Sequence, residues 1–229
     1  MTKAAILIDG GFFIKRLPAV KPDVTMGDTE QVANAIQELV YSHLDYLKKV
    51  YSVSHRNQLL YRTFYYDATP YDQKAHQPVS NRSLDFAVTA QARFRKELFL
   101  TLHRLPNLAV RLGEVKIDRN NPWVLKQGGQ KDLLNGQRSP GELTDEDFSP
   151  ALRQKGVDMR IGLDIASITL KKQADIIILV SGDADFVPAA KMARREGVKF
   201  VLDPLWHHIS DDLEEHIDQL RSGFPKPNR

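Results

Sequence analysis

Two short, uniformly apolar runs stand out in the pattern of hydrophobic and polar positions along the chain. Residues 4–8 read AAILI and residues 176–180 read IIILV. Runs this short, without polar alternation, predict strands that are buried on both faces, as in a parallel sheet. Asp9 follows the first run, and Asp183 and Asp185 follow the second. Because ligands bind at the carboxyl edge of open α/β sheets, these acids form the first candidate site.

The remaining periodicity predicts strands that alternate with helices. Apolar residues at helical spacing predict helices at about 28–51, 86–105, 155–172, 186–196 and 210–220. Further strands are expected at 59–66, 108–117 and 198–202, and the turn residues at 118–122 predict that the strand at 108–117 forms a hairpin with 123–125. This order predicts an α/β fold whose mostly parallel sheet is flanked by helices.

Length and composition favour one domain. The chain has 229 residues, of which 42% are hydrophobic and 27% are charged, and a single domain over 1–222 is expected. The polar segment at 118–155 is expected to be an insertion or flap, and 223–229 a flexible tail. No run is long enough to span a bilayer and no leader is evident, so we expect a cytoplasmic protein. Exposed aromatic residues such as Trp123 leave a homodimer contact open.

Charge and cysteine usage limit the chemistry. The sequence has no cysteine, which excludes disulfides and thiolate metal sites and leaves Asp, Glu and His as metal ligands. A net charge of +3 permits a polyanionic partner without requiring one.

Acidic residues reach the expected sheet edge from separate segments, because Asp158 at a helix start joins Asp9, Asp183 and Asp185. Each has a structural explanation by itself, since Asp185 suits an N-cap, Asp183 suits a turn and Asp158 suits the helix dipole. Together, unpaired carboxylates would repel one another and raise one another's pKa, so a cluster requires cations. Mg²⁺ and Mn²⁺ suit oxygen ligands, and they can activate water against a phosphodiester.

Three motifs resemble the NYN domain, a branch of the PIN-like nuclease fold, and especially its LabA-like (DUF88) bacterial group. They are IDGG at 8–11, KGVD at 155–158 and SGDADFVP at 181–188. The resemblance implies a parallel sheet flanked by helices and an acidic, divalent-metal pocket that cleaves RNA. By motif position, the resemblance makes the catalytic and metal-binding residues Asp9, Asp158, Asp183 and Asp185.

Other positions are expected to support this site. Asp164 lies between the polar and apolar sides of its helix and is expected to have a polar partner. The resemblance places Asp164 behind the metal ligands, and Ser181 is placed there with it. Many such domains have an Asn where this chain has Phe12, so the resemblance implies a site that is weaker or arranged differently here.

The first expected function is therefore a metal-dependent ribonuclease acting on single-stranded RNA. Lys155 and Arg160 are the candidate phosphate contacts, and Phe12 is a candidate platform for base stacking. The cations at 191, 194 and 195 are expected to flank the acids, and the acidic helix over 211–218 is expected to face away.

Two other functions compete with this one. A non-catalytic RNA-binding or regulatory module that keeps the nuclease fold is allowed by Phe12 and by the modest net charge. A haloacid-dehalogenase-like phosphatase is disfavoured, because such enzymes need Asp-x-Asp after the first strand and Asp9 is followed by Gly10 and Gly11.

Overall fold

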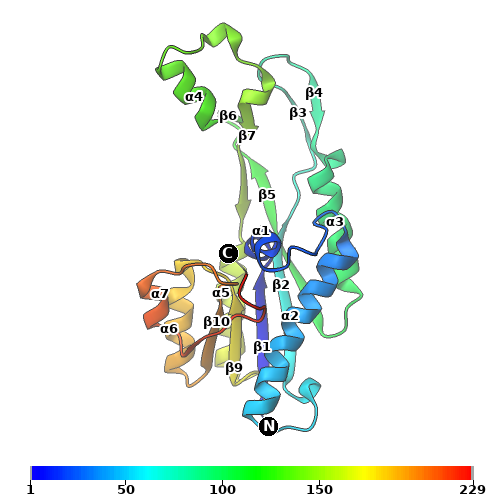
Figure 1. The fold of residues 1–229 in the computed structure, drawn as a ribbon, viewed down its shortest axis with the longest axis vertical. Helices are drawn as coiled ribbons and strands as arrows, with labels where there is room; N and C mark the ends of the chain where they lie inside the picture. The colour runs from blue at the N-terminus through cyan, green and yellow to red at the C-terminus, as the bar shows by residue number, and fades with distance from the viewer. Residues whose placement is uncertain (1, 228–229) are drawn as a thin grey trace. The chain divides into compact units, whose positions relative to one another are not determined.

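A computed structural model describes residues 2–227, which fall into two compact units (Figure 1). The first unit contains the chain up to residue 67, residues 97–113, and the chain from residue 156 onward. The second contains residues 68–96 and 114–155, so it includes the whole of the expected insertion together with an earlier segment.

The main sheet confirms the prediction of a mostly parallel α/β fold. Its strand order is β11-β10-β9-β1-β2-β5-β8, and every pairing from β11 through β10, β9 and β1 to β2 is parallel. The antiparallel pairing of β5 with β8 joins residues of the second unit. The strands are β1 (Ala4–Asp9), β2 (Leu60–Thr69), β5 (Leu108–Ile117), β8 (Leu152–Lys155), β9 (Ile176–Val180), β10 (Lys199–Asp203) and β11 (Gln219–Leu220).

Burial is most complete in β1 and β9, the neighbouring strands that the two apolar runs predicted. Every residue of 4–8 and of 176–180 is at most 1% exposed. Their parallel register pairs Leu7 with Leu179 and Ile8 with Val180. The chain therefore leaves both strands at the same level of the same sheet edge, at Asp9 and Ser181.

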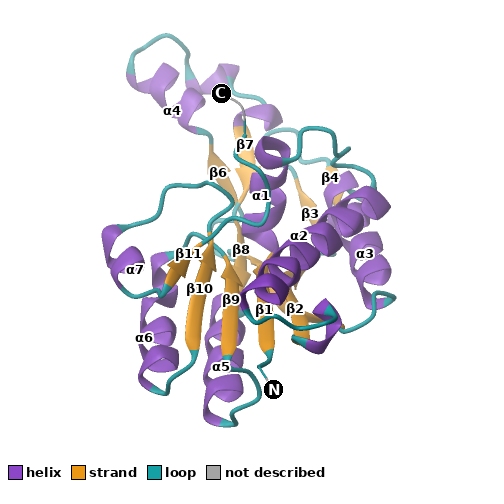
Figure 2. Cartoon of the chain, turned by 60° about the horizontal axis from the view of Figure 1, so that its bottom comes forward, coloured by secondary structure: helices purple, strands orange, loops and turns teal. Residues whose placement is uncertain are grey.

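Helices cover both faces of this sheet (Figure 2). Helix α2 covers one face, while α5 and α6 pack against each other on the opposite face. Helix α6 starts near the carboxyl end of β9 and ends near the amino end of β10. The helices of the first unit are α1 (Gly10–Val20), α2 (Thr29–Val50), α5 (Val157–Leu170), α6 (Val187–Arg195) and α7 (Asp211–Glu215), and α3 (Ala90–His103) passes from the second unit into the first. No helix among the described residues is both long and apolar enough to cross a membrane.

A buried polar chain ties α2 to β10 and to the segment after β11. His43 and Asp203 are both almost completely buried, and His43 Nε2 lies 2.8 Å from Asp203 Oδ2. Arg221 Nη1 lies 3.0 Å from His43 Nδ1. Because a guanidinium can only donate, Nδ1 accepts this bond and Nε2 holds the proton that is donated to Asp203. The same Asp203 carboxylate accepts the Gly223 N–H at 2.8 Å.

The second unit is built from short strands around aromatic side chains. Strand β3 (Lys74–His76) pairs with β4 (Ser83–Asp85), and β6 (Trp123–Leu125) pairs with β7 (Phe148–Pro150). Helix α4 (Gln127–Leu134) follows β6. The ring of Phe86 lies 5.2 Å from that of Tyr71 and 6.4 Å from that of Trp123. These aromatic contacts join the unit's two sequence segments.

Several predicted elements are wrong. The hairpin between 108–117 and 123–125 does not form, because β5 pairs with β8 and β6 pairs with β7. The helix predicted at 86–105 is divided into a 3₁₀ turn (Phe86–Val88) and α3. The helix predicted at 210–220 ends at Glu215, since the residues after it pair with β10 instead.

Two further differences lie at the ends of the first unit. Helix α1 was not predicted, although Phe13, Leu17 and Val20 bury one face of it. The expected flexible tail is anchored at its start, because Phe224 is 2% exposed and its carbonyl accepts the Trp206 indole N–H at 2.8 Å. Burial of this ring explains why the chain does not fray at Gly223.

Gly10 provides a test of the packing beneath the sheet edge. A Cβ at Gly10 would lie 2.5 Å from the Tyr65 ring and 2.6 Å from the Tyr66 carbonyl oxygen. We expect Gly10→Ala to lower the free energy of unfolding by about 1–3 kcal/mol, measured by urea denaturation. Gly162→Ala is the matched control: a Cβ at this helical glycine meets nothing within 4 Å, so the change should stabilise the protein by up to about 1 kcal/mol. Equal effects of the two substitutions would contradict this packing.

Candidate functional site

Asp9 ends β1 and is the N-cap of α1. Its Oδ1 accepts the Phe12 backbone N–H at 3.0 Å, so the carboxylate is held against the first turn of the helix. Burial raises the pKa of Asp9, the bond from Phe12 N–H lowers it, and the charge of Asp158 raises it again. The net effect is a raised pKa, which means that the folded protein disfavours the ionised form.

Ser181 links the ends of β1 and β9. Its side chain is fully buried, and its hydroxyl donates to Asp9 Oδ2 at 3.4 Å while it accepts the Asp183 backbone N–H at 3.3 Å. Asp183, and not Asp185, acts as the N-cap here, because its Oδ1 accepts the Asp185 N–H at 3.0 Å and opens the 3₁₀ turn Ala184–Phe186. One hydroxyl therefore fixes the spacing between the two strand-end acids.

Asp158 lies in the first turn of α5 and faces the same charges. Burial raises the pKa of the Asp158 carboxyl, and the charges of Asp183 and Asp185 raise it further. Asp158 in turn raises the pKa of Asp9. The charge of Asp158 therefore acts on Asp9, the charges of Asp183 and Asp185 act on Asp158, and no cation of the chain is among the causes of either shift.

An open pocket of about 360 Å³ lies over this edge of the first unit. Phe12 and His207 form one side of it, with ring centroids 6.1 Å apart in an edge-on arrangement. A Cβ at Gly182 would lie 3.0 Å from the Phe12 ring, so a larger residue here would require the ring to move by a few tenths of an ångström. The lining residues are Asp9, Phe12, Ser181, Gly182, Asp183, Ala184 and His207.

Asp164 has the polar partner that its helix position predicted. The Tyr66 hydroxyl donates to Asp164 Oδ2 at 2.8 Å, and Arg111 Nε lies 3.4 Å from the same oxygen. Burial raises the pKa of Tyr66 and the neighbouring Asp164 charge raises it further, so Tyr66 remains a donor. Tyr66 is also the register partner of Asp9 on β2.

Arg111, Tyr66 and His207 are residues near this edge that the sequence did not single out. The guanidinium of Arg111 lies 5.6 Å from the centre of the Phe64 ring. Only the position of His207, shortly after the carboxyl end of β10, could have indicated its place in the pocket.

The two predicted phosphate contacts, Lys155 and Arg160, lie in different units of the protein. Arg160 Nη1 donates to the Gly156 carbonyl oxygen at 2.8 Å, so its guanidinium folds back on the start of its own helix. Lys155 ends β8 and belongs to the second unit. Phe12 lines the pocket beside Asp9 and Asp183, where the stacking prediction needs it.

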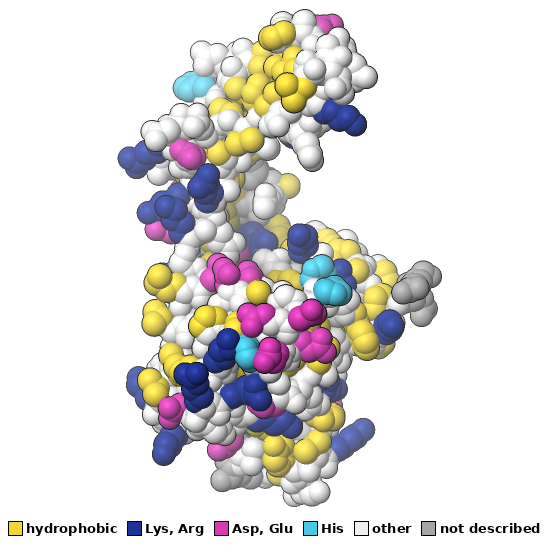
Figure 3. Space-filling model, turned by 90° about the vertical axis from the view of Figure 1, so that its left-hand side faces the viewer, with side chains coloured by type: hydrophobic (Ala, Val, Ile, Leu, Met, Phe, Trp, Pro, Cys, Tyr) yellow, Lys and Arg dark blue, Asp and Glu magenta, His cyan; other side chains and the backbone are white. Residues whose placement is uncertain are grey.

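The expected positions of the basic and acidic segments near the C-terminus are wrong. Lys191, Arg194 and Arg195 line a separate groove at the far end of α6, together with Asp218, so they do not flank the acids. Figure 3 shows Lys and Arg side chains gathered beside a His and a group of acidic side chains. Helix α7 does not face away, because it contacts the 3₁₀ turn that contains Asp185.

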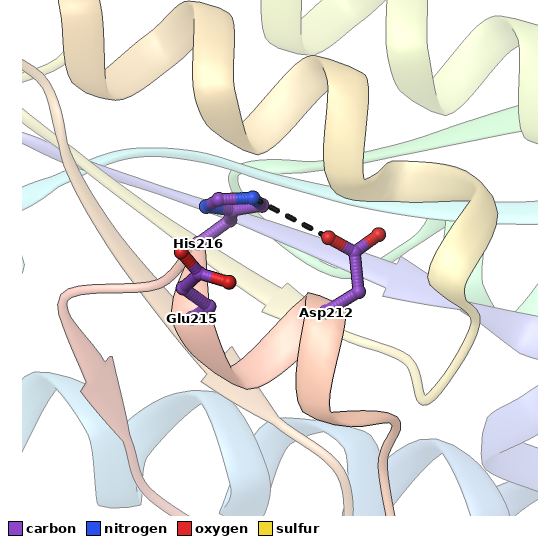
Figure 4. A group of neighbouring side chains, drawn as sticks. All are labelled: Asp212, Glu215 and His216. Atoms are coloured by element: carbon purple, nitrogen blue, oxygen red, sulfur yellow. Dashed lines mark ion pairs between the residues drawn. The ribbon is translucent and has the colours of Figure 1, made fainter.

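A second acidic group lies on and just after α7. Asp212, Glu215 and His216 each offer a ligand atom within 4.8 Å of the others, and Asp212 Oδ1 lies 3.4 Å from His216 Nε2 (Figure 4). Among the described residues, this is the group of three acidic or histidine side chains whose ligand atoms all lie within 4.8 Å of one another. Asp9, Asp158 and Asp183 therefore do not all offer ligand atoms within that spacing of one another.

The strand-end acids fit a hard divalent cation by their chemistry. They supply only carboxylate oxygens, with the Ser181 hydroxyl behind them, and the pKa values of both Asp9 and Asp158 are raised, first by burial and then by the charge of neighbouring acids. Such a donor set suits Mg²⁺ or Mn²⁺.

A family comparison agrees with part of the motif set. Residues 141–221 match the family model of the NYN domain. Over 155 residues the chain is 22% identical to the uncharacterized protein MJ0482 of Methanocaldococcus jannaschii, a match that covers 66% of this chain and 61% of that protein.

Among solved structures, a protein of unknown function from Vibrio parahaemolyticus, VPA0982, aligns with a TM-score of 0.46 and 16% identity, covering 97% of this chain and 95% of that one. The NYN match includes Asp158, Asp183 and Asp185 but not Asp9. The mostly parallel sheet flanked by helices is consistent with a PIN-like fold, and the match supports a relationship to the NYN and PIN-like nuclease superfamily.

Proposed function

We propose that this protein is a divalent-metal-dependent ribonuclease that hydrolyses phosphodiester bonds of single-stranded RNA. The observation that supports this best is the charge coupling at the carboxyl edge of the sheet, where Asp158 raises the pKa of Asp9 and is itself acted on by Asp183 and Asp185. Acids that raise one another's pKa are held in place at a cost in stability, which is expected of a functional site rather than of caps and turns. The motifs shared with the LabA-like group favour the same activity.

Each residue of the site has a distinct role in this proposal. Asp9, Asp158, Asp183 and Asp185 would hold Mg²⁺ or Mn²⁺, and the bound ion would activate a water and neutralise charge on the phosphodiester. Ser181 keeps Asp9 and Asp183 at a fixed separation through its two hydrogen bonds. The Phe12 ring offers a stacking surface at the pocket wall.

The alternative is a non-catalytic RNA-binding or regulatory module on the same fold. The observation that favours it is Phe12, which brings a hydrocarbon ring to a position where many related domains have an amide side chain. Such a module would bind RNA through its cations without cleaving it, so a cleavage assay separates the two functions.

A cleavage assay with single and duplex RNA tests the activity. We expect single-stranded RNA to be cut in Mn²⁺ or Mg²⁺, cutting to stop in excess EDTA, and duplex RNA to be cut much more slowly. The reason is that a duplex cannot easily bring its scissile phosphate to a pocket at a sheet edge. Gel analysis of end-labelled RNA measures the products. Cutting that persists in EDTA, or equal cutting of both substrates, would contradict the mechanism.

Replacing one strand-end acid tests the role of the cluster. Asp183→Asn keeps a side chain able to cap the turn at 184–186 but removes a metal-binding charge, so we expect cleavage to fall at least about 100-fold. Asp212→Asn on α7 is the matched control and should cleave like the unaltered protein. Cleavage by Asp183→Asn at the rate of the unaltered protein would contradict a metal-binding role for Asp183.

The raised pKa of Asp9 predicts how stability depends on pH. Asp9 binds its proton more tightly in the folded than in the unfolded chain, so its ionisation costs stability as pH rises through the folded pKa. Asn also caps helices well, so in EDTA at pH 7 we expect Asp9→Asn to raise Tm by roughly 2–4 °C. The gain should vanish below pH 3.8, the ordinary pKa of an aspartate side chain, because the carboxyl is then protonated in both states. A Tm gain that grows on acidification would refute this.

A further inference from the structure

A basic groove lies in the first unit at the opposite end of α6 from the acids. It has a volume of about 720 Å³ and is open to solvent. Residues from the end of α6 and the start of β10 form one part, and residues just after α7 form the other. The lining residues are Lys191, Arg194, Arg195, Gly197, Val198, Lys199, His216 and Asp218.

Most of the positive charge in this groove has no internal partner. Arg194 Nε donates to Asp218 Oδ1 at 2.9 Å, and its Nη1 donates to the Glu215 carbonyl oxygen at 3.3 Å. Asp218 is committed further, since its other oxygen accepts the Phe200 N–H at 2.7 Å. Within residues 2–227, the ammonium groups of Lys191 and Lys199 and the guanidinium of Arg195 form no ion pair.

The groove therefore presents unneutralised cations beside one arginine whose orientation is fixed. Its open form suits an extended ligand that crosses the surface, because a small molecule needs an enclosed site that buries most of its area. An extended chain with a regularly repeated negative charge is the ligand that such cations bind well, through release of its counterions. A nucleic acid backbone has this chemistry.

We propose that the basic groove binds the phosphodiester backbone of single-stranded RNA, several nucleotides away from the acids. The part of this proposal that makes the bound RNA the substrate of the acids rests on the ribonuclease function proposed above. The acids repel a polyanion, so affinity has to come from elsewhere in the protein.

Helix α6 sets the distance between the two sites. Asp183 and Asp185 precede it, the groove lies at its end, and its nine residues span roughly 13 Å at about 1.5 Å per residue. At about 3.4 Å per stacked nucleotide, this corresponds to about four nucleotides. A strand held in the groove would thus reach the acids along α6, while the acidic helix α7 borders the path on one side.

Binding measured without metal tests the groove separately from cleavage. The probe is a fluorescent oligouridylate of about 12 nucleotides, titrated in EDTA and followed by fluorescence anisotropy over a range of salt concentrations. Arg195→Gln with Lys199→Gln removes two unpaired cations and leaves the Arg194–Asp218 pair intact. We expect affinity to fall about 10-fold or more near 0.1 M salt, and the slope of log K against log salt to decrease by about 1.4.

Lys48→Gln with Lys49→Gln at the end of α2 is the matched control, because it removes the same charge from another exposed surface. Its affinity and salt slope should stay close to those of the unaltered protein. Equal losses in both double variants, or no loss in the groove variant, would overturn the proposal. If the unaltered protein fails to cut RNA while the groove variant still loses affinity, the groove stands and the proposed ribonuclease activity fails.

Discussion

The parallel pairing of β1 with β9 is the constraint on which the site depends. These strands come from opposite ends of the sequence, and both are buried on both faces. Their register leaves Asp9 and Ser181 at the same level, and the Ser181 hydroxyl then joins Asp9 to the turn that contains Asp183. A shift of one residue in this pairing would separate these side chains and expose part of each apolar run. Core packing and site geometry are therefore fixed by the same contacts.

Electrostatics at this edge oppose folding, whereas the packing beneath it favours folding. Asp9 gains a hydrogen bond from the Phe12 N–H and another from Ser181, yet burial and Asp158 still raise its pKa. The cations that could balance the acids lie elsewhere, since Arg111 pairs with Asp164 and the groove cations lie at the far end of α6. The acids and the groove cations thus lie at opposite ends of α6, which fits the proposal that a metal binds at one end of this helix and a polyanion at the other.

The sequence predicted the parts of this structure that depend on local pattern. Uniform apolar runs identified β1 and β9, and the acids that follow them identified the carboxyl edge. The pairing partners of strands were harder to predict from the sequence. The residues at 123–125 looked like the return strand of a hairpin, but they pair with β7. The reason is that the choice of a strand's partner depends on distant segments. Gln219 and Leu220 continued a helical pattern and yet pair with β10. Arg111 could not be connected with Asp164 without knowing that β5 lies beside β2.

We propose that the acids at the carboxyl edge, and not the group on and just after α7, hold the divalent ion. Isothermal titration of the metal-free protein with Mn²⁺ tests this directly when it is repeated with Asp158→Asn and with His216→Ala. The charges of Asp183 and Asp185 act on Asp158, and His216 belongs to the group with ligand atoms within 4.8 Å. We expect Asp158→Asn to abolish or strongly weaken Mn²⁺ binding and His216→Ala to leave it unchanged. Loss of binding in His216→Ala, with full binding retained in Asp158→Asn, would contradict it.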